Sequence, residues 1–241
     1  MRRLFFLAVL LVACTASAAE VRVFAAASLR EALSAIAGAY ERNGSDKIVF
    51  SFGASSLLAR QIQEGAPADL FLSADEEKMN ALAQRGLIVP RSRVSVLSNS
   101  LVIVVPKSGG KKITSSRQLA SLQSLALAEP NSVPAGIYAR KYLQKIGVWN
   151  EVKTKVIPTD NVRSALAAVE SGNVDAAIVY KTDALISKEV RVAYEVPRAD
   201  APEISYPFAL VTNDAAARRF LAHLRSPAAL RVFATYGFAI R

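Results

Sequence analysis

Two serines follow strand-like segments and open amphipathic helical segments. The apolar stretch 21–27 ends at Ser28, and the β-rich stretch 48–52 ends shortly before Ser55 and Ser56. Each pattern predicts a short strand that turns directly into a helix. A hydroxyl at such a junction either caps the helix or joins the free N–H groups of its first turn in binding an anion. Because the arrangement occurs twice, the two junctions could face one ligand.

Further neutral hydrogen-bond donors stand at other predicted strand ends. Residues 133–136 and 161–163 each open a predicted helix, where backbone N–H groups lack acceptors within the helix. Tyr180 closes a predicted strand with a phenolic hydroxyl, although a half-buried packing role is an alternative for it. Helix N-termini and hydroxyls that converge on one cleft are typical of a receptor for a small oxyanion.

The sequence contains few residues that could act as the base or acid of a hydrolase. His223 is the only histidine and lies in a predicted helix far along the chain from either serine junction, so we interpret it as a surface or packing residue. A serine without a base is a poor nucleophile. Four aspartates are candidate acids, but they lie in separate predicted elements, and we interpret them as helix caps or turn residues: Asp69, Asp75, Asp160 and Asp175. No metal, phosphate-loop or nucleophile-elbow motif is present, so we expect no enzyme activity, no catalytic residue and no cofactor.

Composition is typical of a globular α/β protein with a basic surface. The 241 residues are 52% hydrophobic and carry a formal charge of +10, which provides ample material for a core and attracts anions. No run of basic residues interleaved with aromatic residues occurs, so we expect no nucleic-acid partner.

The first 19 residues have the features of a secretory signal peptide. Arg2 and Arg3 precede a short apolar run, and small residues then lead to a cleavage site after Ala18 or Ala19. We therefore expect export to the periplasm. Cys14 is the only cysteine, so cleavage leaves a chain without disulfides; an alternative is lipidation at Cys14, because the residues before it resemble a lipoprotein processing box.

Strands and helices alternate along the chain, which predicts an α/β fold of two lobes. We expect lobe I over 20–97 plus 203–241 and lobe II over 98–202, with crossings near 98–101 and 196–206. Each lobe is expected to hold a mixed, mostly parallel sheet flanked by helices. Ligands bind at the C-terminal ends of strands in such sheets, so the cleft between the lobes is the expected site.

Within lobe II the pattern predicts helices over 116–122, 137–146 and 161–171. The second of these helices is opened by the turn at Pro134, Ala135 and Gly136.

Four motifs in order resemble the periplasmic molybdate-binding proteins of ABC transporters. The similarity runs from about Val21 to the ending at 236–238 and is carried by FAAASL at 24–29, by 59–71, by VPAGIYA at 133–139 and by NVRSAL at 161–166. The resemblance implies the two-lobed type II periplasmic-binding-protein fold. It also implies that the chain binds molybdate or tungstate without a cofactor and delivers it to a membrane ABC permease. We expect the chain to be a monomer.

The resemblance also implies a set of ligand-binding residues. Ser28 and Ser55 match positions that contribute hydroxyl and backbone donors, Ala135 and Val162 match positions that contribute backbone N–H groups, and Tyr180 contributes its hydroxyl. Ser56 remains an alternative to Ser55. A receptor for sulfate, thiosulfate or phosphate, and a secreted serine hydrolase, remain alternative functions.

The five implied residues include no carboxylate. Phosphate near neutral pH carries a proton that a selective site must accept, whereas molybdate and sulfate need only donors. We therefore expect that phosphate does not compete with molybdate and that affinity changes little between about pH 6 and pH 8.5, below the ionisation of tyrosine. This argument does not distinguish sulfate from molybdate as the ligand.

Overall fold

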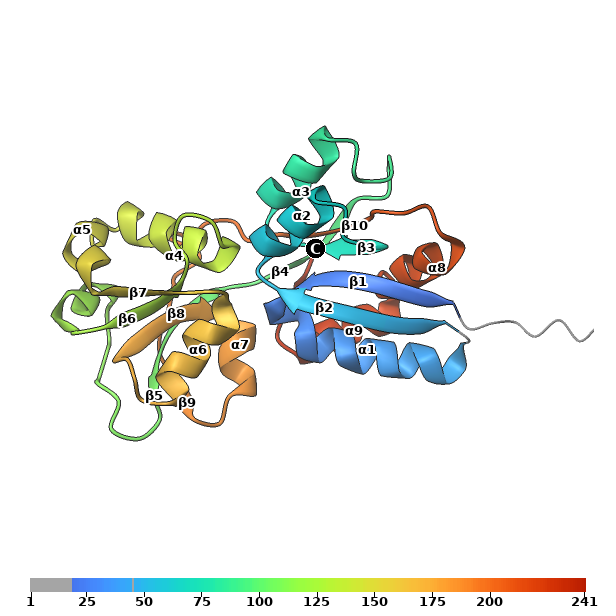
Figure 1. Ribbon diagram of the computed structural model, residues 1–241. Helices are drawn as coiled ribbons and strands as arrows, with labels where there is room; N and C mark the ends of the chain where they lie inside the picture. Colours follow the sequence, from blue (N-terminus) through green and yellow to red (C-terminus); the bar gives the residue numbers. More distant parts are fainter. Residues whose placement is uncertain (1–18, 45) are drawn as a thin grey trace, which may run out of the picture.

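The computed structural model describes residues 19–44 and 46–241 and shows two lobes, each built on its own sheet (Figure 1). The predicted signal peptide, apart from Ala19 at one of its two expected cleavage sites, and the lipidation alternative at Cys14 lie outside the described residues. We call the part that contains the six-stranded sheet lobe I and the part that contains the five-stranded sheet lobe II.

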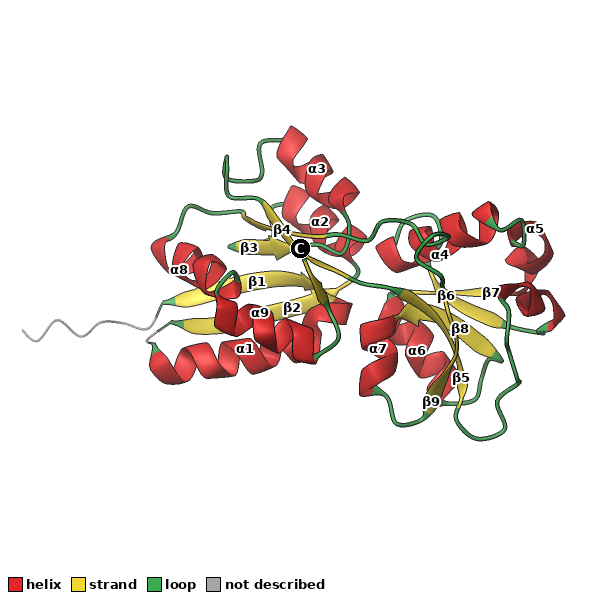
Figure 2. Ribbon diagram, turned by 180° about the vertical axis from the view of Figure 1, so that it is seen from behind, coloured by secondary structure: helices red, strands yellow, loops and turns green. Residues whose placement is uncertain are grey.

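Lobe I is built from both ends of the described chain. Its strands lie in the order β11-β4-β10-β3-β1-β2, and helices cover the sheet (Figure 2). Its elements are β1 (Glu20–Ala26), the 3₁₀ turn η1 (Ala27–Leu29), α1 (Arg30–Asn43), β2 (Lys47–Gly53), α2 (Ser55–Gln63), β3 (Leu70–Leu72), α3 (Glu76–Gln84), β4 (Val94–Ser98), β10 (Tyr206–Leu210), α8 (Ala215–Leu224), α9 (Pro227–Thr235) and β11 (Ala239–Ile240).

Lobe II is formed by the continuous middle of the chain. Its strands lie in the order β7-β6-β8-β5-β9. Its elements are β5 (Leu101–Pro106), the 3₁₀ helix η2 (Ser116–Ser121), β6 (Leu125–Ala128), α4 (Pro134–Lys145), α5 (Trp149–Val152), the 3₁₀ turn η3 (Lys153–Lys155), β7 (Val156–Thr159), α6 (Val162–Glu170), β8 (Ala176–Tyr180), α7 (Lys181–Ile186) and β9 (Val190–Glu195).

Two segments carry the chain between the lobes. Residues 99–100 join β4 to β5, and residues 196–205 join β9 to β10. The second segment is tied to the start of the first, because the hydroxyl of Ser98 at the end of β4 donates to the carbonyl of Ile204 at 2.7 Å. The lobes are therefore connected by a short, hydrogen-bonded waist (Figure 1).

The two-lobed α/β architecture with mixed sheets is confirmed. The sheets were expected to be mostly parallel, but antiparallel strand pairs slightly outnumber parallel ones. β1 pairs in parallel with β2 and β3, and β6 pairs in parallel with β7 and β8. The other five strand pairs among the described residues are antiparallel. Each of these five contains β4, β5 or β10, the strands next to the waist that leave or re-enter a lobe.

Two local predictions in lobe II need correction. The segment predicted as a helix over 116–122 is the 3₁₀ helix η2, capped by the hydroxyl of Ser115. Helix α4 begins at Pro134, three residues earlier than predicted, because proline suits the first helical position, where no N–H donor is needed. This earlier start brings Ala135 into the first turn of α4.

Strand β5 of lobe II, which lies between β8 and β9, is buried along almost its whole length. All five residues of β5 from Leu101 to Val105 have no exposed surface, as expected for a β-branched run covered on both faces. Among residues 19–44 and 46–241, no helix is both long and apolar enough to cross a membrane.

Candidate functional site

All five residues implied by the resemblance line one small cavity between the lobes. Its volume is about 20 Å³, a scale of a few atoms rather than of an organic solute. It is lined by Ala26, Ala27, Ser28, Gly53, Ala54, Ser55 and Ala74 of lobe I and by Val133, Pro134, Ala135, Asn161, Val162 and Tyr180 of lobe II. None of these residues carries a formal charge, so the cavity can hold an ion only through neutral donors.

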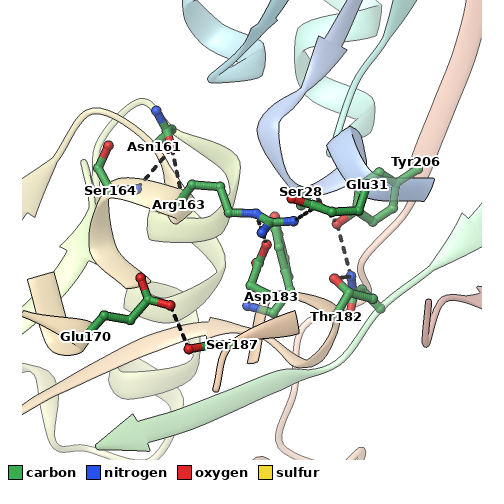
Figure 3. Close-up of polar contacts among 12 residues, drawn as sticks. Ser28, Glu31, Asn161, Arg163, Ser164, Glu170, Thr182, Asp183, Ser187 and Tyr206 are labelled. Carbon is green, nitrogen blue, oxygen red and sulfur yellow. Dashed lines mark hydrogen bonds and ion pairs between the residues drawn. The ribbon is translucent and has the colours of Figure 1, made fainter. Parts of the chain in front are cut away.

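Ser28 lies in η1, between the end of β1 and the start of α1. Its side chain is 3% exposed, and its Oγ lies 3.1 Å from the hydroxyl of Tyr206 on β10 (Figure 3). The chain turns here into a helix whose first N–H groups have no intrahelical acceptor. Ser28 therefore brings a hydroxyl and a helix N-terminus to the cavity together.

Ser55 is the first residue of α2 and is 1% exposed. Its Oγ accepts a hydrogen bond from the backbone N–H of Ala74 at 2.9 Å, which leaves its own hydrogen free to point into the cavity. Ser56 is only partly buried and lines a different, outer cleft together with Arg60 and Asp160. Of the two candidate serines, only Ser55 lines the cavity.

Lobe II contributes the N-termini of α4 and α6. Because Pro134 has no N–H, the first backbone donor of α4 belongs to Ala135. The next residue, Gly136, allows α4 to approach the sheet, since a Cβ there would lie 1.9 Å from the carbonyl oxygen of Ala128 at the end of β6. The approach sets the position of the Ala135 N–H.

The N-terminus of α6 is capped selectively. The side chain of Asn161 accepts from the backbone N–H groups of Arg163 at 2.9 Å and Ser164 at 3.2 Å. The N–H of Val162, at the first position of α6, has no intrahelical acceptor because of its position. Val162 is 4% exposed and lines the cavity, so its N–H is a donor available to a ligand there.

Tyr180 closes β8 and is 1% exposed. Its hydroxyl is buried and has no hydrogen-bond partner among the described residues. Burial also raises the pKa of Tyr180 well above its ordinary value, so the hydroxyl keeps its proton and remains a donor. An unpaired buried hydroxyl costs about 1–3 kcal/mol, so this group indicates a ligand that accepts from it.

A buried ion pair lies beside the cavity and was not anticipated from the sequence. The Nε of Arg163 lies 2.7 Å from Oδ1 of Asp183, which is fully buried, and the guanidinium also contacts Glu31 on α1 (Figure 3). Asp183 accepts from the backbone N–H of Tyr180 at 3.2 Å. Burial raises the pKa of the Asp183 carboxyl to about 7, with the Arg163 charge opposing the shift. Glu31 is 132 residues from Arg163, so no local pattern could reveal the contact.

The residues considered for acid–base chemistry lie elsewhere. His223 packs against Tyr40, with ring centroids 4.9 Å apart, and does not line the cavity. Of the four aspartates expected to be helix caps or turn residues, Asp75 caps α3. Asp69 and Asp175 instead accept from backbone N–H groups far away in the sequence, those of Arg22 and Gln123, and Asp160 lines the outer cleft. The cavity therefore pairs its serines with no base among the residues that line it.

Comparison with known proteins agrees with this arrangement. The model of the bacterial extracellular solute-binding protein family matches residues 21–239. The molybdate-binding protein ModA of Escherichia coli is 41% identical over 230 residues, which cover 92% of this chain and 90% of that protein. Two solved structures share the fold at lower identity. The periplasmic molybdate-binding protein of Azotobacter vinelandii has a TM-score of 0.83 at 22% identity, and the match covers 92% of this chain and 99% of that chain. The sulfate-binding protein SubI of Mycobacterium tuberculosis has a TM-score of 0.80 at 21% identity, and the match covers 91% of this chain and 86% of that chain. The chain belongs to the family of bacterial extracellular solute-binding proteins.

Proposed function

We propose that this protein captures molybdate, and also tungstate, in the cavity between its lobes and releases it unchanged. The observation that carries the proposal is the set of neutral donors around one small cavity, including the unpartnered hydroxyl of Tyr180. The 41% identity to a protein named for molybdate binding supports the choice of anion.

The physical basis of binding is a shell of charge-assisted hydrogen bonds. We expect the hydroxyls of Ser28, Ser55 and Tyr180 and the N–H groups of Ala135 and Val162 to donate to the oxygens of the anion. Each such bond contributes roughly 1.5–3 kcal/mol net, and the positive ends of the surrounding helix dipoles add to it. A dianion can therefore be held tightly without a counter-charge and without a cofactor.

Enclosure requires donors from both lobes. Ser28 and Ser55 belong to lobe I, whereas the other three donors belong to lobe II, so the anion is enclosed only when the lobes close about the waist. Closure also gives the bound form a surface different from that of the free form, which a membrane permease can recognise. We propose an ABC permease as the partner, a monomeric state, and the periplasm as the site of action.

Sulfate is the main competing ligand, and thiosulfate and phosphate follow it. The fold does not decide among these anions, because a sulfate-binding protein and a molybdate-binding protein resemble this chain about equally in shape. Hydrolysis is less well supported, because no histidine or carboxylate lines the cavity beside the serines.

Calorimetric titration of the purified chain from residue 20 onward tests the proposal. The protein is first unfolded and refolded to remove bound anion and is then titrated with molybdate, tungstate, sulfate, thiosulfate and phosphate. We expect molybdate and tungstate to bind at least a hundredfold more tightly than the others. Sulfate binding as tight as molybdate binding would reassign the protein to sulfate.

A further inference from the structure

A groove on lobe I is lined by three arginines and by no acid. It has a volume of about 300 Å³ and shares no residue with the cavity between the lobes. The arginines are exposed, and none of them forms an ion pair within residues 19–44 and 46–241: Arg91, Arg218 and Arg225. The rest of the lining is mostly apolar and consists of Val89, Pro90, Ser92, Leu210, Leu221 and Ala222. The groove therefore combines three uncompensated positive charges with an apolar surface.

Helix α8 supplies two of the arginines from a single face. Arg218 and Arg225 are seven residues apart, and the apolar residues 221–222 lie between them on the same side of the helix. Arg225 lies at the C-terminal end of α8, where the helix dipole carries about half a negative charge. Three full positive charges outweigh that half charge, so the groove attracts anions.

The loop before β4 supplies the third arginine and is fixed in place. The N–H of Val89 donates to the carbonyl of Leu210 at 2.8 Å, and the N–H of Leu210 donates to Oγ of Ser92 at 3.1 Å. Oγ of Ser92 donates in turn to the carbonyl of Val89 at 2.7 Å. Arg91 lies within this turn at a φ of 63°, the only left-handed residue other than glycine in the part of the chain that the structure describes. Such a backbone is costly for a residue with a side chain, and here it places an arginine in the groove.

The groove lies at the end of lobe I where the described chain begins. Leu210 at the end of β10 pairs with Leu70, which pairs with Val23 near the start of β1. This end of lobe I points away from the waist (Figure 1). Cys14, the alternative site of lipidation, is five residues before Ala19, so an acyl anchor there would begin within about 17 Å of Ala19. A membrane surface is thus the anionic partner that this position favours.

We propose that this groove binds the phosphate of an anionic phospholipid headgroup and holds the protein at the membrane surface. A guanidinium can donate two parallel hydrogen bonds to one phosphate, so three arginines suit a surface of such headgroups. The apolar lining can contact the carbon atoms next to the phosphate. The cavity between the lobes lies at the other end of lobe I and is left uncovered. The proposal is independent of which anion that cavity takes.

Sedimentation with lipid vesicles tests the proposal. The chain from residue 20 onward is mixed with vesicles of phosphatidylcholine, with or without phosphatidylglycerol, at about 0.1 M salt, where charges more than about 10 Å apart are largely screened. We expect binding only to vesicles that contain phosphatidylglycerol, and equal binding to the neutral vesicles would overturn the proposal. Replacing all three arginines, as Arg91→Gln, Arg218→Gln and Arg225→Gln, should weaken binding about a hundredfold, because each charge near an anionic surface contributes about fivefold.

A second triple variant removes the same charge from lobe II and is the matched control. Lys107, Lys112 and Arg117 are also exposed and lack ion pairs within the described ranges. Their replacement by Gln should leave most of the vesicle binding intact. Equal losses in the two triple variants would mean that net charge alone attracts the protein, and the groove would not be a site.

Arg91→Gly removes one charge while keeping the fold. Glycine tolerates the left-handed backbone at this position, so the turn is retained, and vesicle binding should fall about fivefold. Unchanged binding in this variant and in the arginine triple variant would overturn the proposal. Molybdate affinity should equal that of the wild type in every variant, so failure at the groove leaves the proposed function intact.

Glycerol phosphate separates a free phosphate from a lipid headgroup. It is titrated by calorimetry into the wild type and into the arginine triple variant, so that the difference reports on the groove alone. Binding that the triple variant loses, together with no binding of the wild type to vesicles, would reassign the groove to a soluble phosphate and overturn the membrane proposal.

Discussion

Arg163 and Glu31 form an ion pair between α6 of lobe II and α1 of lobe I. The Arg163 side chain is 18% exposed and the Glu31 side chain 33%, so the pair is only partly screened by water. The Nε of Arg163 also contacts Oδ1 of Asp183, which belongs to the same lobe as Arg163. Because its members belong to different lobes, the pair should break when the lobes move apart.

Replacing Glu31 by Gln should speed the release of molybdate. Loss of a partly exposed ion pair weakens closure by up to about 1 kcal/mol, so we expect the dissociation rate to rise about two- to fivefold. Stopped-flow displacement by tungstate measures this rate. Glu20→Gln is the control, because Glu20 pairs with Arg22 within one strand of lobe I. Equal rates in the two variants would show that the contact between lobes does not govern release.

Removing either cavity serine hydroxyl should weaken binding strongly. Ser28→Ala and Ser55→Ala each delete a donor to a charged acceptor, which corresponds to roughly a ten- to hundredfold loss of molybdate affinity. Calorimetry measures the loss. Ser56→Ala is the neighbouring control and should stay close to wild type, because Ser56 lies in the outer cleft. Wild-type affinity in both cavity variants would mean that these serines only cap their helices and do not bind the anion.

Tyr180→Phe should separate stability from binding. The Tyr180 hydroxyl is buried and unpaired in the described structure, so its removal should stabilise the anion-free protein by about 1 kcal/mol, or about 2–4 °C in Tm. The same change should lower molybdate affinity about tenfold or more, because a charge-assisted bond is lost. Thermal unfolding with and without molybdate measures both effects. A lower Tm in the absence of anion would mean that the hydroxyl has a partner within the protein.

Gly136→Ala should damage the fold and the site together. The new Cβ would meet the carbonyl of Ala128 and push α4 away from the end of β6, which we expect to cost about 1–3 kcal/mol and to displace the Ala135 N–H. Denaturant unfolding and calorimetry report the two effects. Gly38→Ala, within α1, is the control. Its nearest atom would lie 3.7 Å away at the flexible end of Arg42, and it should gain about 0.5–1 kcal/mol in helix propensity.

Asp183 should give the stability of the anion-free protein a distinct pH dependence. Its pKa is raised from 3.8 to about 7 by burial, so between about pH 4 and pH 7 the folded protein holds a proton that the unfolded chain has released. The contribution of Asp183 to the free energy of unfolding therefore falls as pH rises through this range and is constant above it. The Arg163 and Glu31 charges and the Tyr180 N–H are the groups that face it.

The measurement is the difference in unfolding free energy between wild type and Asp183→Asn from pH 4 to pH 8. Subtraction removes the carboxyls whose pKa values are lowered, such as Asp46 beside Arg219, which act in the opposite direction. We expect the difference to decline with pH up to about 7. A flat difference would mean that Arg163 keeps the carboxyl ionised throughout.

Local sequence patterns were sufficient for much of the fold and for several of the turns that position the candidate site, whereas the set of five candidate residues was implied by the family resemblance. The turns at Ser28 and Ser55 and the helix start at Val162 are each set by neighbouring residues, so period and capping signals reveal them. The contacts that support the site are different. Tyr206 lies 178 residues from Ser28, and such pairings follow from how the lobes pack rather than from any spacing along the chain.

Titratable neighbours were missed for the same reason. The five implied residues contain no acid, and Asp160, which the sequence indicated as a helix-cap or turn residue, lies in the outer cleft. The buried acid beside the cavity is Asp183, three residues after Tyr180 in the first turn of α7. Its position resembles an ordinary helix-start acid in sequence, and only the packing of α6 against α7 makes it buried.

The place of β10 in lobe I imposes an order on how the newly made protein can fold. β10 joins β3 to β4, and within the described part of the chain the partners of β4 in the sheet are β10 and β11, both from the last 36 residues. Lobe II, in contrast, is complete once residue 195 has emerged. Pulse-labelled hydrogen exchange during refolding should therefore protect the amides of β6 and β8 before those of β4. A chain that emerges N-terminus first therefore leaves β4 without these partners until its last 36 residues have emerged, so lobe I is completed after lobe II.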